Sequence, residues 1–369
     1  MSSSGFDTGA GPYDKVAQSK GGEGLDIDAQ TAGRTEALGE GIDAGAGIRD
    51  NIPGQGLDGG PGDEDVFAAK HGRGEGLDAD DKGSYCPGGG PLRSAASSTS
   101  SKLYPAMILA HGLGGIREIG LDRFASKFTE LGIVCVVFDY RNFGASDGEP
   151  RQLLDINLQL QDWDAALDYT SKLEDVDNSR IGIFGTSFGG GHVISVAAKD
   201  KRVKAVISQC PFTSGLHSSQ TVGFLPLLKL AVLGLRDLLL SKGNNIIPVP
   251  LVGNPGEAAL MNTPDAQAFR KIIPPHLEEK LPDYVAARFA LFIGFYNPGW
   301  HTSSVHCPIL FAICGKDSVA PPGPTLSYAE KAPKATIKYY DQMGHFDIYV
   351  GEEFEIATRD YLEFLRQNL

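Results

Sequence analysis

The feature that most constrains how this chain folds is the pentapeptide GTSFG at residues 185–189. A mostly apolar run at 180–184 precedes it with the length of a buried strand, and residues 190–198 after it are suited to a helix. Glycine on each side of Ser187 allows a sharp turn in which neighbouring backbone segments approach closely and φ becomes positive. The sequence therefore predicts a strand–turn–helix unit that exposes the Ser187 hydroxyl at the carboxyl end of a strand.

Short apolar runs alternate with amphipathic segments after residue 102. Helices are expected around Phe124 to Leu131 and at residues 156–173, 190–198 and 353–367. Strands that lack polar alternation are buried on both faces, and their alternation with helices indicates βαβ units. We predict an α/β fold with a mostly parallel sheet and helices on both faces. The expected strands are residues 106–110, 133–138, 181–184, 203–208, 309–313 and 337–340.

Residues 1–101 differ in composition and are dominated by Gly, Asp, Glu and Ser. Large apolar residues are few and follow neither a helical nor a strand period, so the segment cannot bury enough surface to offset its conformational entropy. A G-x-G-L-D phrase recurs at 22–26, 54–58 and 74–78, but its unequal spacing excludes a solenoid. We therefore expect a low-complexity, disordered N-terminal tail.

One long insertion, residues 213–305, separates two core segments at residues 102–212 and 306–369. It contains helical stretches and many prolines but no clear strand. An insertion at this point should lie over the carboxyl ends of the strands, where open α/β sheets bind ligands. We predict a helical cap, or lid, over the site.

Aromatic side chains of the insertion are the candidates for substrate contacts. We expect Phe224, Phe295 and Trp300 to take this role. For each ring, the alternative is that it packs the cap onto the core. Together with their apolar neighbours, they favour an acyl or polyketide chain over a sugar or a peptide.

Charge and cysteine usage limit the partners and the compartment. A net charge of −13 and a pI of about 5.1 give the whole chain no attraction to nucleic acid or anionic lipid. The first residues lack the basic and apolar regions of a secretory signal, and the most apolar stretch, 224–240, contains Lys229, Arg236 and Asp237, which argues against a membrane span. Five scattered cysteines without C-x-x-C spacing indicate reduced thiols. The cytosol is the expected location.

A serine hydroxyl becomes a nucleophile only beside a base that an acid orients. When the serine lies in a G-x-S-x-G turn, the acid and then the histidine follow it along the chain. Asp317 lies in the turn after strand 309–313, and His345 lies in the loop between strand 337–340 and the last helix. We therefore predict that Ser187, Asp317 and His345 form a catalytic triad.

Two alternatives concern the acid. Asp317 could serve only to stabilise its turn, as aspartates commonly do. Asp341 and Asp347 are also near His345 in sequence, but both follow the strand that should come after the acid, so they are weaker candidates.

The same chemistry needs backbone N–H groups to hold an oxyanion. We expect one from Phe188, which follows the nucleophile, and one from Leu113 in the loop after the first strand. His111 in that loop is expected to hydrogen-bond within the loop and to border the substrate. No second ligand has suitable spacing to His111, which argues against a metal there. The triad chemistry itself needs no metal and no organic cofactor, so we expect neither.

Four segments, residues 111–112, 138–148, 185–191 and 344–347, resemble the α/β-hydrolases. More closely, they resemble the branch of fungal polyketide transferases and polyketide thiohydrolases. Relatives have an antiparallel strand pair before the first parallel strand, where this chain has only Ser- and Gly-rich residues. Either the tail forms an irregular edge or the N-terminal reading of the gene is wrong.

The resemblance implies a serine hydrolase or acyltransferase of secondary-metabolite biosynthesis. Its substrate would be an ester or thioester of a hydrophobic acyl or polyketide chain, delivered by a polyketide synthase carrier. A generic carboxylesterase or dienelactone-type hydrolase is an alternative, as is a non-enzymatic binding protein with the same fold. Water and an alcohol both remain open as acceptors, and the oligomeric state is open.

Overall fold

The computed structural model describes residues 92–94 and 103–369, which all belong to one compact unit. Most of the predicted tail, residues 1–91 and 95–101, lies outside the described residues, so its predicted disorder stays a prediction. None of the helices in the described part of the chain is long and apolar enough to cross a membrane.

A seven-stranded sheet forms the centre of the described residues, in the order β1-β3-β2-β4-β5-β8-β9. All neighbouring pairs are parallel except β1 and β3. β3 and β8 are buried along their whole length, and β2, β4 and β5 are buried over their carboxyl-terminal parts, which accounts for the apolar runs without polar alternation in the sequence. Their bounds are β1 (Leu92–Ser94), β2 (Tyr104–Ala110), β3 (Val134–Val137), β4 (Val176–Thr186), β5 (Val203–Gln209), β8 (Ile309–Cys314) and β9 (Ala335–Tyr340).

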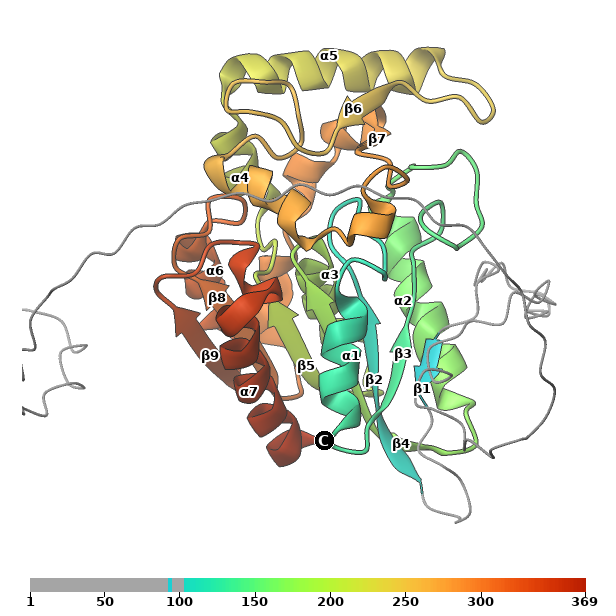
Figure 1. Ribbon diagram of the computed structural model, residues 1–369, viewed down its shortest axis with the longest axis vertical. Helices are drawn as coiled ribbons and strands as arrows, with labels where there is room; N and C mark the ends of the chain where they lie inside the picture. The colour runs from blue at the N-terminus through green and yellow to red at the C-terminus, as the bar shows by residue number, and fades with distance from the viewer. Residues whose placement is uncertain (1–91, 95–102) are drawn as a thin grey trace, which may run out of the picture. The chain divides into compact units, whose positions relative to one another are not determined.

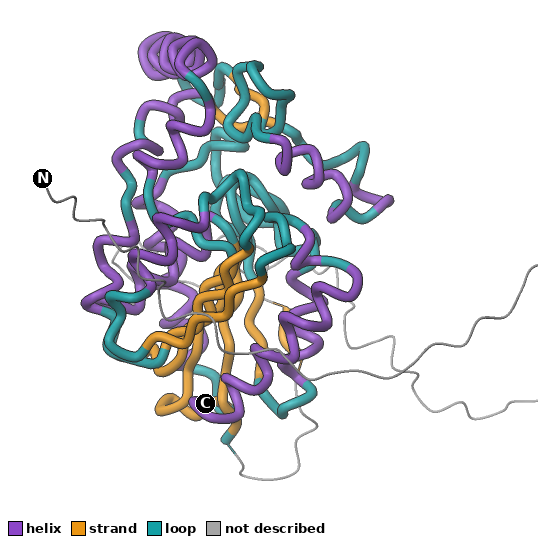
Figure 2. The backbone as a smooth tube through the Cα atoms, turned by 90° about the vertical axis from the view of Figure 1, so that its left-hand side faces the viewer, coloured by secondary structure: helices purple, strands orange, loops and turns teal. Residues whose placement is uncertain are grey.

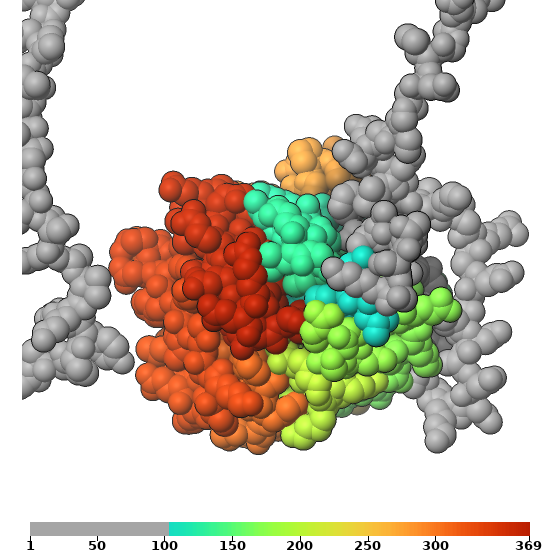
Figure 3. Space-filling model, turned by 90° about the horizontal axis from the view of Figure 1, so that it is seen from below, coloured from blue at the N-terminus to red at the C-terminus, as the bar shows by residue number. Residues whose placement is uncertain are grey.

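Helices cover both faces of this sheet, as Figures 1 and 2 show. Helices α1 and α7 lie side by side on one face (Figure 3), where Lys127 Nζ donates to Glu355 Oε2 at 2.9 Å. Helices α2 and α3 pack together on the other face. The predicted α/β architecture is confirmed. The helix bounds are α1 (Leu121–Thr129), α2 (Ile156–Ser171), α3 (Phe188–Lys199), α6 (Pro322–Ala329) and α7 (Gly351–Asn368), with a short 3₁₀ helix, η7 (Asp347–Tyr349), before α7.

The edge strand β1 falls inside the segment predicted to be tail. Its register pairs Leu92 with Val137 and Ser94 with Cys135, antiparallel to β3. Of the two alternatives for the N-terminal side, the irregular edge is therefore the one observed. A three-residue strand is too short to produce a periodic pattern, which is why the sequence did not indicate it.

The residues between β5 and β8 lie beyond the carboxyl ends of the strands, at the top of Figure 1. The expectation that this insertion contains no strand is wrong, because β6 and β7 form a small antiparallel sheet. Each is three residues long and two of the six residues are proline, so neither resembles a strand in sequence. We keep residues 213–305 as the proposed bounds of the cap. Its elements are α4 (Gly215–Val222), α5 (Phe224–Leu240), β6 (Pro248–Pro250), β7 (Tyr284–Ala286) and the 3₁₀ helices η2 (Pro264–Ile272), η3 (Pro275–Leu277), η4 (Ala287–Leu291), η5 (Ile293–Phe295) and η6 (Pro298–Ser304).

Candidate active site

Ser187 occupies the turn between β4 and α3 with φ 56° and ψ −117°. A side chain at Gly185 would bring its Cβ within 2.1 Å of the Gly189 carbonyl oxygen, so the turn admits only glycine there. The N–H of Ser187 donates to Gln209 O on β5 at 2.8 Å, which ties the turn to the next strand. The predicted strand–turn–helix unit is confirmed.

Three turns at the carboxyl ends of β4, β8 and β9 bring Ser187, Asp317 and His345 together. His345 Nε2 lies 3.0 Å from Ser187 Oγ, and His345 Nδ1 lies 2.6 Å from Asp317 Oδ2. The His345 and Asp317 side chains are almost completely buried. Because a carboxylate oxygen accepts, Nδ1 donates to Asp317 and Nε2 is left to accept from the Ser187 hydroxyl. This is the geometry of a nucleophile, its base and an orienting acid.

The second oxygen of Asp317 stabilises its own turn. Asp317 Oδ1 accepts from the N–H groups of Val319 at 2.9 Å and Ala320 at 2.7 Å, so the carboxylate has a fixed orientation toward His345. The turn-stabilising role and the triad geometry therefore occur together. The weaker candidates make other contacts: Asp347 Oδ2 accepts from Gly344 N at 2.8 Å, and Asp341 bonds Gln342.

The loop after β2 passes directly over the nucleophile. A Cβ on Gly112 would lie 2.8 Å from Ser187 Cβ, so a larger residue would displace the nucleophile. Leu113 and Phe188 both border the space beside Ser187. Neither of their N–H groups donates to another residue within the described part of the chain. Both are thus free to meet an oxygen of a bound molecule.

His111 lies in the same loop and is buried. Its Nδ1 donates to Gly112 O at 2.9 Å, which is the hydrogen bond expected within the loop. Burial lowers the pKa of His111 below its ordinary value, against the opposing effects of Asp139 and the Gly112 carbonyl. Its other ring nitrogen, Nε2, lies 4.0 Å from Asp139 Oδ1, and no hydrogen bond joins His111 to Ser187 within the described residues, so a second general base here has no geometric support.

One group of potential metal ligands occurs among the residues that the structure describes. Cys210, Asp317 and His345 offer ligand atoms within 4.8 Å of one another. Burial raises the pKa of the Cys210 thiol well above its ordinary value, which disfavours the thiolate that a metal would need. His345 and Asp317 already bond each other, so we assign them to the triad geometry.

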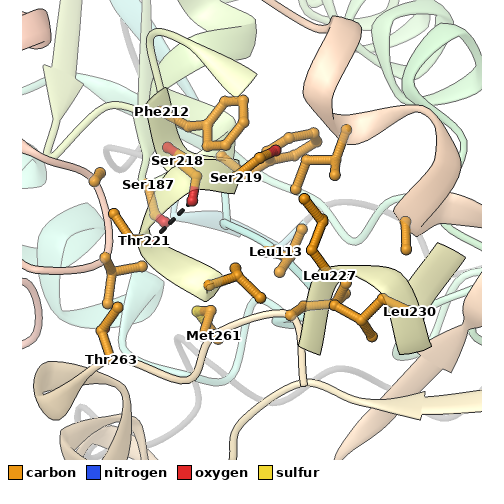
Figure 4. Close-up of a pocket in the computed structure, with 17 residues that line it drawn as sticks. Leu113, Ser187, Phe212, Ser218, Ser219, Thr221, Leu227, Leu230, Met261 and Thr263 are labelled. Atoms are coloured by element: carbon orange, nitrogen blue, oxygen red, sulfur yellow. Dashed lines mark hydrogen bonds between the residues drawn. The ribbon is translucent and has the colours of Figure 1, made fainter. Parts of the chain in front are cut away.

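Two pockets meet at Ser187. The larger encloses about 680 Å³, part of it open to solvent, and lies between the turn of Ser187 and helices α4 and α5 of the cap (Figure 4). Its walls are mostly apolar, with Ser218, Ser219, Thr221 and Thr263 as polar exceptions. The apolar lining residues are Leu113, Phe188, Phe212, Val222, Leu227, Leu230, Leu260, Met261, Ala290, Ile293, Val319 and Ala320.

The smaller pocket, about 380 Å³, also borders the nucleophile. It shares Ser187, Leu113 and Met261 with the larger one and is also bordered by His111 and Phe346. Ser187 therefore borders two pockets. Two pockets could hold two parts of one substrate, one on each side of the bond that is cleaved.

Residues 105–233 match the family described as the alpha/beta hydrolase fold. The chain is 48% identical over 270 residues to the quorum-quenching protein AidA of Acinetobacter baumannii, covering 73% of this chain and 88% of that protein. The chain belongs to the α/β-hydrolase superfamily.

The resemblance to the fungal polyketide branch of this superfamily is confirmed as well. The chain is 28% identical over 279 residues to the thiohydrolase aneE of Aspergillus aculeatus, covering 72% of this chain and 86% of that protein. Among solved structures, GrgF from Penicillium has a TM-score of 0.58 and 24% identity, covering 73% of this chain and 91% of that one, which shows a shared fold. The relatives include proteins named as hydrolases and transferases, so the superfamily assignment supports an enzyme.

Three predicted substrate contacts of this α/β-hydrolase lie away from both pockets. Phe224, Phe295 and Trp300 are 78%, 82% and 68% exposed and border neither space at Ser187. The sequence marked these rings as apolar cap residues but gave no indication of the face on which each lies. The prediction that they contact substrate is not supported, and other residues of α4, α5 and η4 line the larger pocket instead.

Sequence reasoning missed Asp265, which lies on η2 of the cap. Its Oδ2 accepts from the N–H of His345 at 3.0 Å and from the N–H of Ser318 at 3.1 Å. Asp265 thus connects the cap to both loops that carry the base and the acid. No local pattern could have indicated this contact, since Asp265 and His345 are 80 positions apart.

Proposed function

We propose that this α/β-hydrolase is a serine-dependent hydrolase or acyltransferase acting on an ester or thioester of a hydrophobic acyl or polyketide chain. The observation that carries the proposal is the pair of contacts at His345, 3.0 Å to Ser187 Oγ and 2.6 Å to Asp317 Oδ2. A serine without such partners is inert at neutral pH. These contacts provide the base and the acid that orients it.

The reaction follows from these roles. Ser187 Oγ attacks the carbonyl carbon while its proton passes to His345 Nε2. The carbonyl oxygen becomes an oxyanion, which we assign to the N–H groups of Leu113 and Phe188. The bond to the leaving alcohol or thiol then breaks, and His345 gives the proton to that group. Water, or an alcohol in a transfer reaction, attacks acyl-Ser187, loses its proton to His345 and releases the acyl product as Ser187 regains its hydrogen.

The two pockets support a division of the substrate. We assign the acyl chain to the larger space, because its walls are mostly apolar and apolar surface removed from water drives binding. We assign the leaving group, and later the acceptor, to the smaller space bordered by His111. None of these steps needs a metal or an organic cofactor.

The setting of the reaction is part of the proposal. We expect the acyl thioester to come from a polyketide synthase carrier in secondary-metabolite biosynthesis, in line with the fungal relatives. We expect the cytosol as its compartment, because the cysteines are scattered and odd in number.

A second candidate function is quorum quenching, favoured by the 48% identity to AidA over 88% of that protein. In chemical terms, the same acyl-Ser187 route would cleave an ester bond of an apolar signalling molecule. A generic carboxylesterase would share this chemistry with a broader substrate range. A non-enzymatic binding protein would need no activated serine.

Labelling with a fluorophosphonate probe tests the shared chemistry. Wild-type protein should be labelled, Ser187→Ala should not, and Ser219→Ala should be labelled like wild type, because Ser219 borders the same pocket without contacting His345. Labelling of Ser187→Ala at the wild-type rate would refute the assignment of the nucleophile.

A substrate panel then separates the candidates. Thioesters and oxygen esters of short, medium and long acyl chains should be offered with and without alcohol acceptors, and the products identified by mass. Preference for long-chain thioesters supports the polyketide-type reaction, and ester products formed with alcohols identify a transferase. Preference for the esters of apolar signalling molecules supports quorum quenching.

A further inference from the structure

Helix α5 presents an apolar face to solvent at the outer side of the cap (Figure 1). Monomeric proteins rarely expose a contiguous apolar surface of this kind without a partner. The exposed fractions of its large apolar side chains range from 46% to 78%: Phe224, Leu225, Leu228, Val232, Leu235, Leu238, Leu239 and Leu240.

The spacing of these residues defines one stripe, which we call the outer stripe of α5. Leu225, Leu228, Val232, Leu235 and Leu239 follow intervals of three and four, so they share one side of the helix. The residues that α5 buries in the cap, among them Pro226, Leu230 and Asp237, lie on the opposite side. Both the buried side and the outer side of the helix are therefore mainly apolar, although only the buried side has a partner within the described residues.

Basic residues border the outer stripe. Lys229 and Arg236, seven positions apart, lie along the same edge of it, and both are exposed. Asp237, the acidic residue of α5, is fully buried and pairs with Arg288 at 2.7 Å. The exposed charges of the helix are therefore all positive.

We propose that the outer stripe of α5 docks on the surface of a phospholipid bilayer that contains anionic lipid. An apolar helix face flanked by cations is the pattern of helices that lie in the membrane interface, where the cations meet lipid phosphates. The net charge of −13 describes the whole chain, whereas docking depends on the charge of the face that meets the membrane.

A second copy of the chain fits this face less well. In an antiparallel pair centred between Val232 and Leu233, the basic edge of one helix would face the basic edge of the other, with Lys229 opposite Arg236. In a parallel pair, each basic edge would lie against Leu228 and Leu235 of the other copy. The first arrangement places like charges together, and the second buries cations against apolar side chains.

Docking would also place the substrate pocket next to the lipid. Leu227 and Leu230 of α5 line the larger pocket, so one helix borders both the proposed membrane face and the proposed acyl site. This consequence, a supply of apolar substrate from the bilayer, rests on the proposed function. The docking itself does not.

Vesicle flotation of the full chain tests the proposal. Vesicles of phosphatidylcholine alone and of three parts phosphatidylcholine to one part phosphatidylserine serve as probes. The stripe variant is Val232→Glu with Leu235→Glu, since neither residue lines a pocket at Ser187. The control is Leu103→Glu, a similarly exposed leucine directly before β2, at the end of the sheet remote from the cap. The charge variant is Lys229→Glu with Arg236→Glu.

We expect wild-type protein and Leu103→Glu to float with the phosphatidylserine vesicles. In the stripe variant, the partition coefficient should fall about tenfold or more. In the charge variant, it should fall several-fold, and only with the anionic vesicles. Ser187→Ala should float like wild type, so failure of docking and failure of the proposed function are separate results. Thermal unfolding should show that the variants are folded.

Two outcomes would overturn the proposal. The first is that wild-type protein stays at the bottom of the gradient and floats with neither kind of vesicle, which would show that the outer stripe does not bind a membrane. Wild-type protein that sediments as a dimer, and becomes monomeric in the stripe variant, uses the stripe to bind a second copy.

Discussion

The core and the cap of this α/β-hydrolase contribute to the site in different ways. The core supplies the proposed reacting groups from three turns, each fixed by the parallel strand that precedes it, so Ser187, Asp317 and His345 meet through sheet geometry. The cap supplies most of the apolar pocket wall through α4, α5, η4, η5 and the segment that holds Leu260 and Met261. The proposed chemistry therefore depends on turns that the sheet fixes, and the proposed substrate selectivity depends on the less regular structure of the cap.

The sharpest test of the core's role is Ser187→Ala. Removal of the nucleophilic serine costs about six orders of magnitude in kcat in a serine protease with the same triad logic. We expect a loss approaching that size on an activated ester, with thermal unfolding unchanged, because alanine keeps the Cβ atom and loses only the hydroxyl. Ser219→Ala in the cap should keep kcat within a few-fold. Residual turnover of several per cent in Ser187→Ala would place the nucleophile elsewhere.

The next largest effect is expected at the acid. Asp317→Asn retains the size of the side chain but leaves the imidazole in the wrong tautomer, a change that costs about 10⁴ in kcat in the template triad. Asp341→Asn and Asp347→Asn should cost far less, because their carboxylates bond Gln342 and Gly344 N. All three should be assayed on one ester, with circular dichroism to confirm folding. A costly Asp347→Asn beside a mild Asp317→Asn would reverse the assignment.

These two predictions concern residues that the sequence already indicated. A strand followed by a turn is a local pattern, so the order Ser187, Asp317, His345 could be read along the chain. The pocket could not be predicted in this way, since its walls combine Phe212, Leu230 and Met261 from distant segments. The strands β1, β6 and β7 were missed because each has only three residues, which is too few for a periodic pattern. In β6, two of the three residues are also proline.

A change inside the cap should alter selectivity rather than chemistry. Ala290 lines the larger pocket, and Ala290→Leu adds bulk to the proposed acyl site. Since even one methylene group can change selectivity about ten- to a hundredfold, we expect a loss of this size in kcat/KM for long acyl chains relative to short ones. Ala268→Leu, a cap position that lines neither pocket at Ser187, is the matched control. Equal losses for all chain lengths would show that the larger pocket does not hold the acyl chain.

The smallest expected effect concerns Asp265, where cap and core meet. Its Oδ2 accepts from the N–H groups of His345 and Ser318, and its own N–H donates to Ser318 Oγ at 3.2 Å. Asp265→Ala removes both acceptor bonds, whereas Asp265→Asn keeps an acceptor oxygen and loses the charge. A hydrogen bond to a charged group contributes about 1.5–3 kcal/mol to stability. We expect part of this energy to hold the backbone of His345 in place and thereby to position its imidazole. We expect kcat to fall about tenfold in the alanine variant and less in the asparagine variant.

KM should change little in both Asp265 variants, because Asp265 lines neither pocket at Ser187. The matched control is Gln267→Ala on the same helix η2, since Gln267 Nε2 donates to Gly253 O at 3.0 Å within the cap and does not reach the catalytic loops. If Gln267→Ala lowers kcat as much as Asp265→Ala, the effect reflects the stability of the cap as a whole. If only the Asp265 variants lose kcat, the cap contributes to the chemistry through this one contact. Asp265 would then be a cap residue that positions a catalytic group as well as the core residues do.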